Sequence, residues 1–270
     1  RLVRDWSSDV CSSDLRFQEF DNIKINMLKG KPGFTIALET DHNNDSNIMI
    51  SDVGGIEKFN GIDITTNYLK IIEESDIVII SNWASNLDGN QLVNEIFSAA
   101  KDSIKLLDFA DLSTSTNRLQ GLMDNMKNNK IIDVISLNEN ECQILGKFLD
   151  LKKISVEYTI NEIKTMAADI SSILGTIIDI HTPIGSCSAS NGDVEFVESF
   201  PVNPMILTGA GDVWNAINIL GLKKELSTVN RLNLANAAAA SYISEFHNGD
   251  FSLLKVENLL ESRNIFVDSL

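Results

Sequence analysis

The chain has 270 residues, enough for one sizeable α/β core, and its hydrophobic fraction of 43% is ordinary for a globular protein. Its formal net charge of −16 argues against nucleic acid or an anionic membrane surface as a partner. No apolar run reaches the length of a membrane span, so we expect no transmembrane helix and a cytoplasmic location.

The first fifteen residues are expected to lie outside the fold. In one reading frame, the segment from Asp5 to Leu15 back-translates to a sequence that resembles the adapter oligonucleotide of short-read sequencing libraries. The segment has neither an amphipathic period nor the architecture of a signal peptide. We therefore interpret residues 1–15 as a non-native, adapter-like leader, which means that Arg16 is not a natural start. An unusual Ser/Asp-rich leader is the alternative.

Short β-rich runs then alternate with helical patterns along the chain. An early pair of strands, 34–38 and 48–51, is separated by a polar segment and is predicted to form a hairpin. Four apolar strands follow, each bounded by amphipathic helical patterns, which indicates a mostly parallel sheet covered on both faces. These strands are predicted at 76–81, 104–109, 134–137 and 177–180, and the helices near 91–100, 118–127, 139–148, 160–174 and 232–246. No repeat or linker divides residues 16–270, so we expect a single domain.

Polar residues follow each of these strands, at the edge of the sheet where ligands of open α/β sheets gather. They are Asn82 and Trp83, Asp108 and Asp111, Asn138 and Glu141, and Thr182 with Gly185. The cysteines and histidines, by contrast, are few and widely separated, which argues against a disulfide framework or a zinc site. They are Cys11, Cys142, Cys187, His42, His181 and His247. Of these, His181 ends an apolar strand and is expected to be a structural or pocket-wall residue.

The segment Thr208-Gly209-Ala210-Gly211-Asp212 precedes a helical pattern that begins at Val213. Small residues at a helix N-terminus leave backbone N–H groups and the positive end of the helix dipole available to an anion such as phosphate. A carboxylate in the first turn would face that anion and could accept a proton from an attacking hydroxyl group. The pattern indicates phosphoryl transfer; plain helix capping is the alternative.

These segments resemble the motifs of the PfkB (ribokinase-like) carbohydrate kinases. Thr208–Asp212 resembles the C-terminal signature of that family, and Asn138–Glu141 resembles its N-x-x-E motif. Thr182–Gly185 is similar to the T-x-G nucleotide-binding turn with one extra residue, and Ala235–Ala240 is similar to the Ala-rich helix beside the adenine pocket. The resemblance extends from about Gly33 to the C-terminus.

The resemblance implies a fold and a set of roles. The fold would be a ribokinase-like (Rossmann-like) three-layer α/β/α sandwich with a mostly parallel central sheet. Asp212 would be the catalytic base, and the amides of Gly209, Ala210 and Gly211 would form the anion hole. Asn138 and Glu141 would position Mg²⁺ through water. The nucleotide site would be lined by Thr182, Gly185, Thr208 and Asn236.

The implied reaction is ATP-dependent phosphoryl transfer to a hydroxyl group of a small-molecule sugar or nucleoside, with a homodimer as one possible assembly. The chain departs from the family at Ile206-Leu207, Trp214 and Asn215, none of which removes the base or the anion hole. No early strand with a substrate-binding Asp, no G-G-x-x-N motif and no lid strands are recognised before Gly33, so we expect the N-terminal strand and the lid to be missing and the fragment to be inactive if so.

The acceptor therefore stays unassigned, and Asn82, Trp83, Asn86 and Asp111 are the residues left on its side, none assigned individually. Two other hypotheses stay open. The first is a catalytically silent nucleotide- or sugar-binding member of the same fold. The second, a Rossmann-type dinucleotide enzyme, is disfavoured because no G-x-G-x-x-G follows an early strand.

Overall fold

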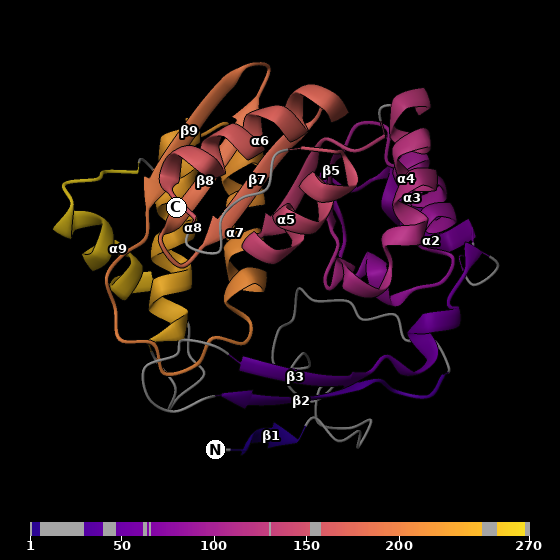
Figure 1. Cartoon of the computed structure of the whole chain (residues 1–270), viewed down its shortest axis with the longest axis horizontal. Helices are drawn as coiled ribbons and strands as arrows, with labels where there is room; N and C mark the ends of the chain where they lie inside the picture. Colours follow the sequence, from indigo (N-terminus) through magenta and orange to yellow (C-terminus); the bar gives the residue numbers. More distant parts are fainter. Residues whose placement is uncertain are drawn as a thin grey trace.

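The computed structural model describes residues 2–5, 30–39, 47–61, 64, 66–129, 131–151, 158–244 and 253–267. Within these residues the chain forms a large six-stranded sheet with helices and a small three-stranded sheet at one edge of it (Figure 1). Cys11, His42 and His247 lie outside the described residues.

The large sheet is parallel over its first four strands, as the alternation of strands and helices predicts. Its strands stand in chain order: β4 (Ile77–Ile80), β5 (Ile104–Asp108), β6 (Val134–Asn138), β7 (Ile177–Thr182), β8 (Gly185–Ser190) and β9 (Asp193–Glu198). Strands β4 to β7 pair in parallel, and β8 and β9 add an antiparallel meander. The meander is not among the predicted strands.

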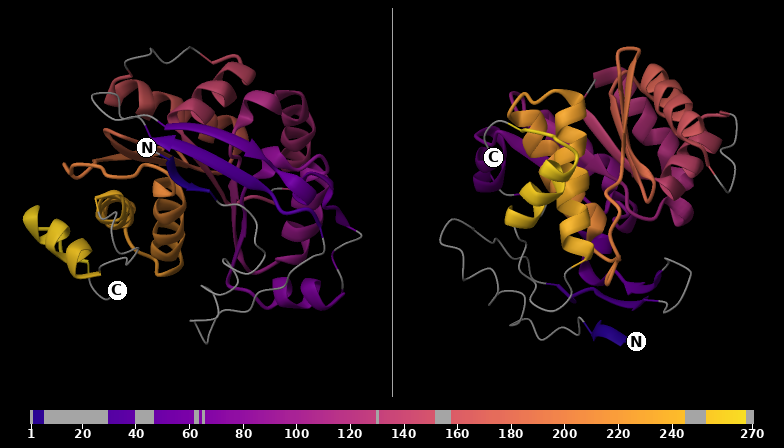
Figure 2. Two further views of the ribbon diagram at one scale, coloured as in Figure 1. Left: turned by 90° about the horizontal axis from the view of Figure 1, so that it is seen from below. Right: turned by 90° about the vertical axis from the view of Figure 1, so that its left-hand side faces the viewer.

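Helices cover both faces of this sheet. They are α2 (Thr66–Glu73), α3 (Gly89–Ala99), α4 (Thr116–Asn129), α5 (Glu139–Phe148), α6 (Ile160–Leu174), α7 (Ala210–Lys223), α8 (Thr228–Ile243) and α9 (Leu253–Ser262). Alternate residues of a strand point to opposite faces. Leu107 of β5 accordingly packs in one core with α3 to α6, and its neighbour Leu106 packs in another with Ile219 of α7. The right-hand view of Figure 2 shows the sheet nearly edge-on between the two helix layers. The predicted three-layer α/β/α sandwich is confirmed.

Local signals explain where several helices begin and end. Thr159 and Glu162 form a capping box at the start of α6, in which each side chain bonds the backbone N–H of the other residue. Gly175, with a φ of 66°, ends the same helix in the left-handed conformation. None of the described helices is long and apolar enough to cross a membrane.

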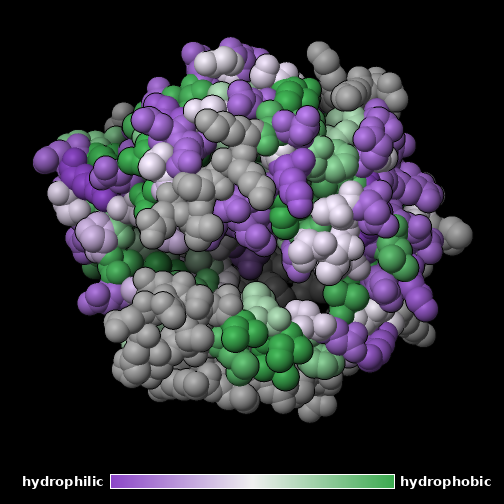
Figure 3. Space-filling view, in the orientation of Figure 1, coloured by the Kyte–Doolittle hydropathy of each residue, from purple (hydrophilic) through white to green (hydrophobic). Residues whose placement is uncertain are grey.

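The small sheet contains the predicted hairpin. Strands β2 (Phe34–Glu39) and β3 (Asn47–Asp52) pair antiparallel, and β1 (Leu2–Asp5) pairs with β2. Strand β1 lies within residues 1–15, which are interpreted above as a non-native leader. Three consecutive residues of β3, Ile48, Met49 and Ile50, are each more than half exposed, and the apolar surface at the lower centre of Figure 3 lies over this sheet. Both faces of β3 are therefore open.

A short connection attaches the small sheet to the large one. After β3 the chain forms the 3-10 helix η1 (Gly54–Lys58), which meets the loop that follows the carboxyl end of β4. The Asn86 side chain on that loop donates to the carbonyl oxygens of Ile56 (2.6 Å) and Phe59 (2.7 Å), and Leu87 N donates to the carbonyl oxygen of Glu57 (2.9 Å). The small sheet therefore stands beside the carboxyl edge of the large one, where the predicted site residues lie, and the surface is hollowed between the two (Figure 3).

Candidate active site

The glycine turn forms the N-terminus of α7, as predicted. Gly209 is the N-cap residue with a φ of 92°, a conformation that favours glycine, and Asp212 lies in the first turn of the helix. The first N–H groups of a helix have no intrahelical partner. Ala210 N is nevertheless engaged, since it donates to the carbonyl oxygen of Leu207 at 3.2 Å. Of the three amides expected to form the anion hole, Ala210 N is therefore already engaged, while Gly211 N lies with Asp212 N in the first turn of α7.

A second carboxylate, Asp108, lies near Asp212. Asp108 ends β5, and burial followed by the negative charge of Asp212 raises its pKa, against hydrogen bonds from Ala110 N (3.0 Å) and Asn215 Nδ2 (2.7 Å). Asn215 stands one turn after Asp212 on α7, and its side-chain oxygen accepts from the hydroxyl of Ser136. This chain of contacts fixes the Asp108 carboxylate against α7. Burial also raises the pKa of Asp212 itself.

Asn138 and Glu141 form a capping box at the start of α5. The side-chain oxygen of Asn138 accepts from Glu141 N (2.9 Å), and the carboxylate of Glu141 accepts from Asn138 N (3.0 Å) and Nδ2 (2.9 Å). The capping role is thus present in the structure. Burial, with a smaller contribution from the charges of Asp108, Glu139 and Asp111, raises the pKa of Glu141 to about 8. The Glu141 carboxylate therefore also belongs to the acidic group at this edge of the sheet.

The donor set at this edge fits a magnesium ion that is held partly through water. The described residues contain no group of three His, Cys, Asp or Glu side chains that could together hold a metal ion. Mg²⁺, however, usually keeps several waters and binds through one or two carboxylates and the phosphates of its substrate. Burial and neighbouring carboxylates raise the pKa of Asp108 and Glu141, Asp212 acting on Asp108 and Asp108 on Glu141, and the hydrogen bonds that oppose the rise come from amides. A divalent cation would relieve that repulsion.

The predicted nucleotide-binding residues come from three places: the turn between β7 and β8, the start of the glycine turn, and the middle of α8. Thr182 and Gly185 close the turn between β7 and β8, where Thr182 Oγ1 donates to the carbonyl oxygen of Gly185 at 2.7 Å. The carbonyl oxygen of Thr208 accepts from the Tyr242 hydroxyl at 3.1 Å. Asn236 is 6% exposed; its side chain accepts from Trp214 Nε1 (2.9 Å) and donates to backbone carbonyl oxygens of β9. Asn236 therefore links α7, through Trp214, to strand β9.

His181 lies directly under the glycine turn. Its ring centroid is 5.1 Å from that of Trp214, and a Cβ atom added to Gly211 would lie 3.2 Å from His181 Cε1. Burial lowers the pKa of His181 to about 4, so the ring is neutral. These contacts agree with the expected structural or pocket-wall role.

The residues left for the acceptor side divide into two kinds. Trp83 (1% exposed) and Asn86 (5% exposed) are buried, and Arg118 lies over the Trp83 ring at 4.8 Å from its centroid. Trp83 and Asn86 therefore stabilise the fold around the end of β4. Asn82 and Asp111 are exposed, but the Asp111 side chain caps η4 (Leu112–Thr114) by accepting from Ser113 N at 2.9 Å.

Sequence reasoning misses three residues that the structure brings to the site. Ser136 and Asn215 form the chain of contacts to Asp108, and Tyr242 bonds the glycine turn. One signal was available for Asn215, because Asp212, Asn215 and Asn218 recur at a spacing of three along α7 and so share a face. Tyr242 carries no such local signal.

No protein-family model and no curated protein matches the chain. Solved structures do. The chain is similar to the ribokinase of Arabidopsis thaliana complexed with ribose and ATP, at 19% identity over 86% of this chain and 70% of that one, with a TM-score of 0.63. It is similar to the ribokinase of Thermotoga maritima, at 17% identity over 94% and 78% of the two chains, with a TM-score of 0.69. It is also similar to the adenosine kinase of Sinorhizobium meliloti, at 15% identity over 97% and 76%, with a TM-score of 0.70. Identities this low establish the fold alone: the chain has the ribokinase-like fold, as its resemblance to the PfkB carbohydrate kinases predicts.

Proposed function

We propose that the protein transfers the γ-phosphoryl group of ATP to a hydroxyl group of a sugar or nucleoside. The observation that carries the proposal is the glycine turn at the start of α7, which sets Asp212 and the first N–H groups of the helix at the carboxyl edge of the sheet. A base and an anion-binding turn held together on one rigid helix are what transfer of a charged group to a hydroxyl requires.

In this proposal Asp212 accepts the proton of the acceptor hydroxyl. Burial raises the pKa of Asp212 above that of an exposed carboxylate, which makes it a better proton acceptor in its ionised form. The N–H groups at the start of α7 stabilise the negative charge that develops on the transferring group, aided by the helix dipole. Asp108 and Asn215 hold the helix turn against β5.

Asn138 and Glu141, with Asp108 nearby, would hold Mg²⁺ and its waters beside the nucleotide phosphates. The ion would supply the positive charge that offsets the triphosphate. Thr182, Gly185, Thr208 and Asn236 would line the nucleotide site. Two of the similar structures support ATP and Mg²⁺ as ligands: the Arabidopsis ribokinase is complexed with ribose and ATP, and a putative ribokinase II from E. coli with ATP and Mg²⁺.

The test is an ADP-release assay with ATP, magnesium and a panel of sugars and nucleosides. Asp212→Asn should lower turnover by roughly 10²- to 10⁴-fold, the usual contribution of a general base. Asp193→Asn, a matched change of an exposed carboxylate at the start of β9, should leave turnover unchanged. Normal turnover by the Asp212 variant would overturn the proposed mechanism.

The catalytically silent alternative has a distinct signature in the same experiment. A silent binding protein would be stabilised against heat by Mg-ADP or a sugar and would release no ADP with any acceptor of the panel. That result would leave the fold and the binding site in place and remove the catalytic role of Asp212.

A further inference from the structure

The last turn of α8 binds the segment that leads into the glycine turn through hydrogen bonds. The carbonyl oxygen of Ile243, at the C-terminal end of α8, accepts from Met205 N (2.7 Å) and Ile206 N (3.2 Å). The last carbonyl groups of a helix have no intrahelical partner, so the carbonyl oxygens at this end of α8 can accept hydrogen bonds from other segments. The approach to the glycine turn is thereby fixed to a helix from elsewhere in the chain.

Two residues further along this segment, at Thr208, the contact is made by a side chain. The Tyr242 hydroxyl donates to the carbonyl oxygen of Thr208 at 3.1 Å, which is the residue directly before Gly209. The tyrosine also occupies the space beside that glycine, since a Cβ atom added to Gly209 would lie 2.6 Å from Tyr242 Oη. Tyr242 therefore bonds the turn at one residue and packs against it at the next.

The orientation of the Thr208–Gly209 peptide decides where the following N–H groups point. Gly209 sits at a φ of 92°, a conformation from which glycine can depart at low cost because it has no side chain. A glycine turn needs an external contact to keep one conformation, and the Tyr242 hydroxyl is such a contact on the Thr208 side. His181 lies close to the opposite end of the turn, since a Cβ atom added to Gly211 would lie 3.2 Å from His181 Cε1.

We propose that Tyr242 is a positioning residue of the candidate active site: its hydroxyl holds the Thr208 carbonyl and so keeps the N–H groups of Gly211 and Asp212 directed at the transferring phosphoryl group. The proposal rests on the proposed function. Tyr242 touches neither substrate nor phosphate in this role, and acts through the turn alone.

Tyr242→Phe is the informative variant, because it removes only the hydroxyl and keeps the ring that packs against Gly209. Ser244→Ala is its matched control: the Ser244 hydroxyl, at the same end of α8, donates to the carbonyl oxygen of Ala240 (2.6 Å) within the helix. Both variants should melt within a few degrees of the wild type.

The first readout compares two nucleotides and needs no acceptor. The turn is expected to meet the γ-phosphoryl group, so Tyr242→Phe should weaken binding of the magnesium complex of AMP-PNP, a non-hydrolysable ATP analogue, by roughly fivefold to tenfold and leave Mg-ADP unchanged. Ser244→Ala should change neither affinity. An equal loss for both nucleotides, or no loss for either, would overturn the proposal.

The second readout is amide hydrogen exchange of the free protein over residues 205–213. Exchange should be faster in Tyr242→Phe than in the wild type and unchanged in Ser244→Ala. If the wild type binds neither nucleotide, the proposed function fails, while faster exchange in the variant still supports the contact between Tyr242 and the turn. Unchanged exchange would show that the hydroxyl does not hold the turn, whatever the activity.

Discussion

His181 shows how a single residue can be fixed in one protonation state by its place in the fold. It lies near the end of β7, where its ring is 5.1 Å from that of Trp214 and close to Gly211. Burial lowers its pKa to about 4, and the charge of Asp179 on the same strand only partly opposes this shift. The ring therefore supports the glycine turn as a neutral group over the whole physiological pH range.

This shift makes a prediction about stability and pH. The unfolded chain binds a proton at His181 near the ordinary pKa of about 6.5, whereas the folded protein binds it only near 4. Stability from this residue is therefore present above pH 6.5 and is lost as the pH falls towards 4. His181→Phe, which keeps a ring against Trp214, lacks that loss.

Urea denaturation at several pH values between 7 and 4 measures this loss of stability. The free energy of unfolding of the wild type, relative to His181→Phe, should decrease by about 1 to 3 kcal/mol from pH 7 to pH 4. The carboxylates that titrate in this range are common to both proteins and cancel in the comparison. A difference that stays constant with pH would show that His181 is protonated in the folded state as easily as in the unfolded one.

At the scale of elements, a buried ion pair ties α7 and α8 to the sheet. Arg231 of α8 (2% exposed) binds Asp179 of β7 (0% exposed) through two contacts, Nη1 to Oδ2 at 2.7 Å and Nη2 to Oδ1 at 3.2 Å. Asn218 of α7 donates to the same carboxylate at 2.6 Å, and Arg231 also reaches Ser188 Oγ of β8 at 2.8 Å. The helix that carries Asp212 is thus held at its middle as well as at its first turn.

Arg231→Met should be far more destabilising than a matched change on the surface. It leaves the Asp179 carboxylate buried without its cation, which costs about 3 to 5 kcal/mol. Lys223→Met removes the exposed contact from Lys223 Nζ on α7 to Asp76 Oδ1 (2.9 Å) and should cost at most about 1 kcal/mol. Urea denaturation of both variants at pH 7 measures the difference. Similar costs would mean that water reaches Asp179 when Arg231 is absent.

The elements that the sequence predicts are those with a strong local period. The four parallel strands, their helices and the hairpin follow from apolar spacing and capping signals, and so does the glycine turn. Strand β8 was not predicted because its apolar residues, Cys187 and Ala189, are small and alternate only with serines, which is a weak strand pattern. The partner of Asp179 lies 52 residues away in the sequence, and no local pattern can point to it. The acidic residues of the site were found for the opposite reason, because each carries a local signal: Asp108 and Glu141 lie at the carboxyl ends of strands β5 and β6, and Asp212 follows the glycine turn.

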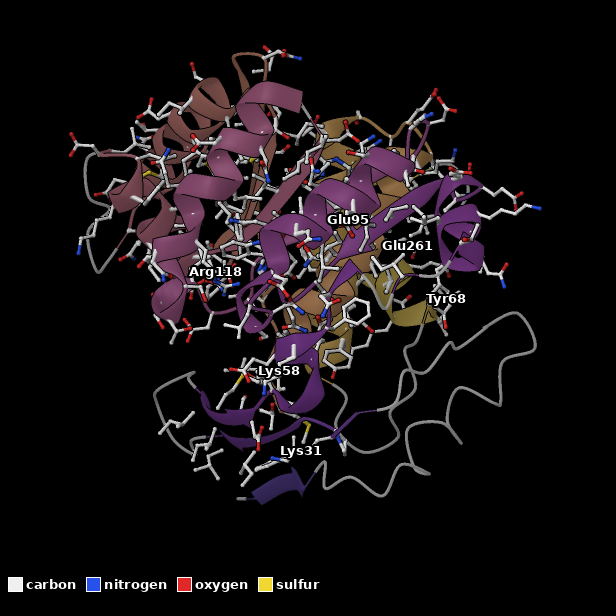
Figure 4. All side chains as sticks on the ribbon, turned by 90° about the vertical axis from the view of Figure 1, so that its right-hand side faces the viewer. Lys31, Lys58, Tyr68, Glu95, Arg118 and Glu261 are labelled. Atoms are coloured by element: carbon white, nitrogen blue, oxygen red, sulfur yellow. The ribbon has the colours of Figure 1, made fainter. Side chains whose placement is uncertain are left out.

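At the scale of the whole molecule, the two sheets meet through a few contacts around one loop. Arg118 extends from α4 to this loop, where it donates to the carbonyl oxygens of Ala84 (2.6 Å) and Asn86. Figure 4 shows Arg118 on the side of the large body that faces the small sheet, with Lys58 of η1 between the two. The Asn86 side chain completes the junction by holding the carbonyl oxygens of Ile56 and Phe59. The position of the small sheet beside the candidate site therefore depends in part on the two hydrogen bonds of Asn86.

Asn86→Ala should loosen the small sheet without unfolding the large one. The variant loses two hydrogen bonds from a side chain that is 5% exposed and leaves two carbonyl oxygens without these donors. Hydrogen exchange followed by mass spectrometry should show roughly tenfold or more faster exchange over residues 47–61, because local opening becomes easier by about the free energy of the lost bonds. Strands β5 and β6, whose apolar side chains are buried on both faces, serve as the internal reference and should exchange as in the wild type. If exchange instead rises equally in both sheets, the junction is part of one cooperative unit, and the small sheet cannot open over the site while the large sheet stays folded.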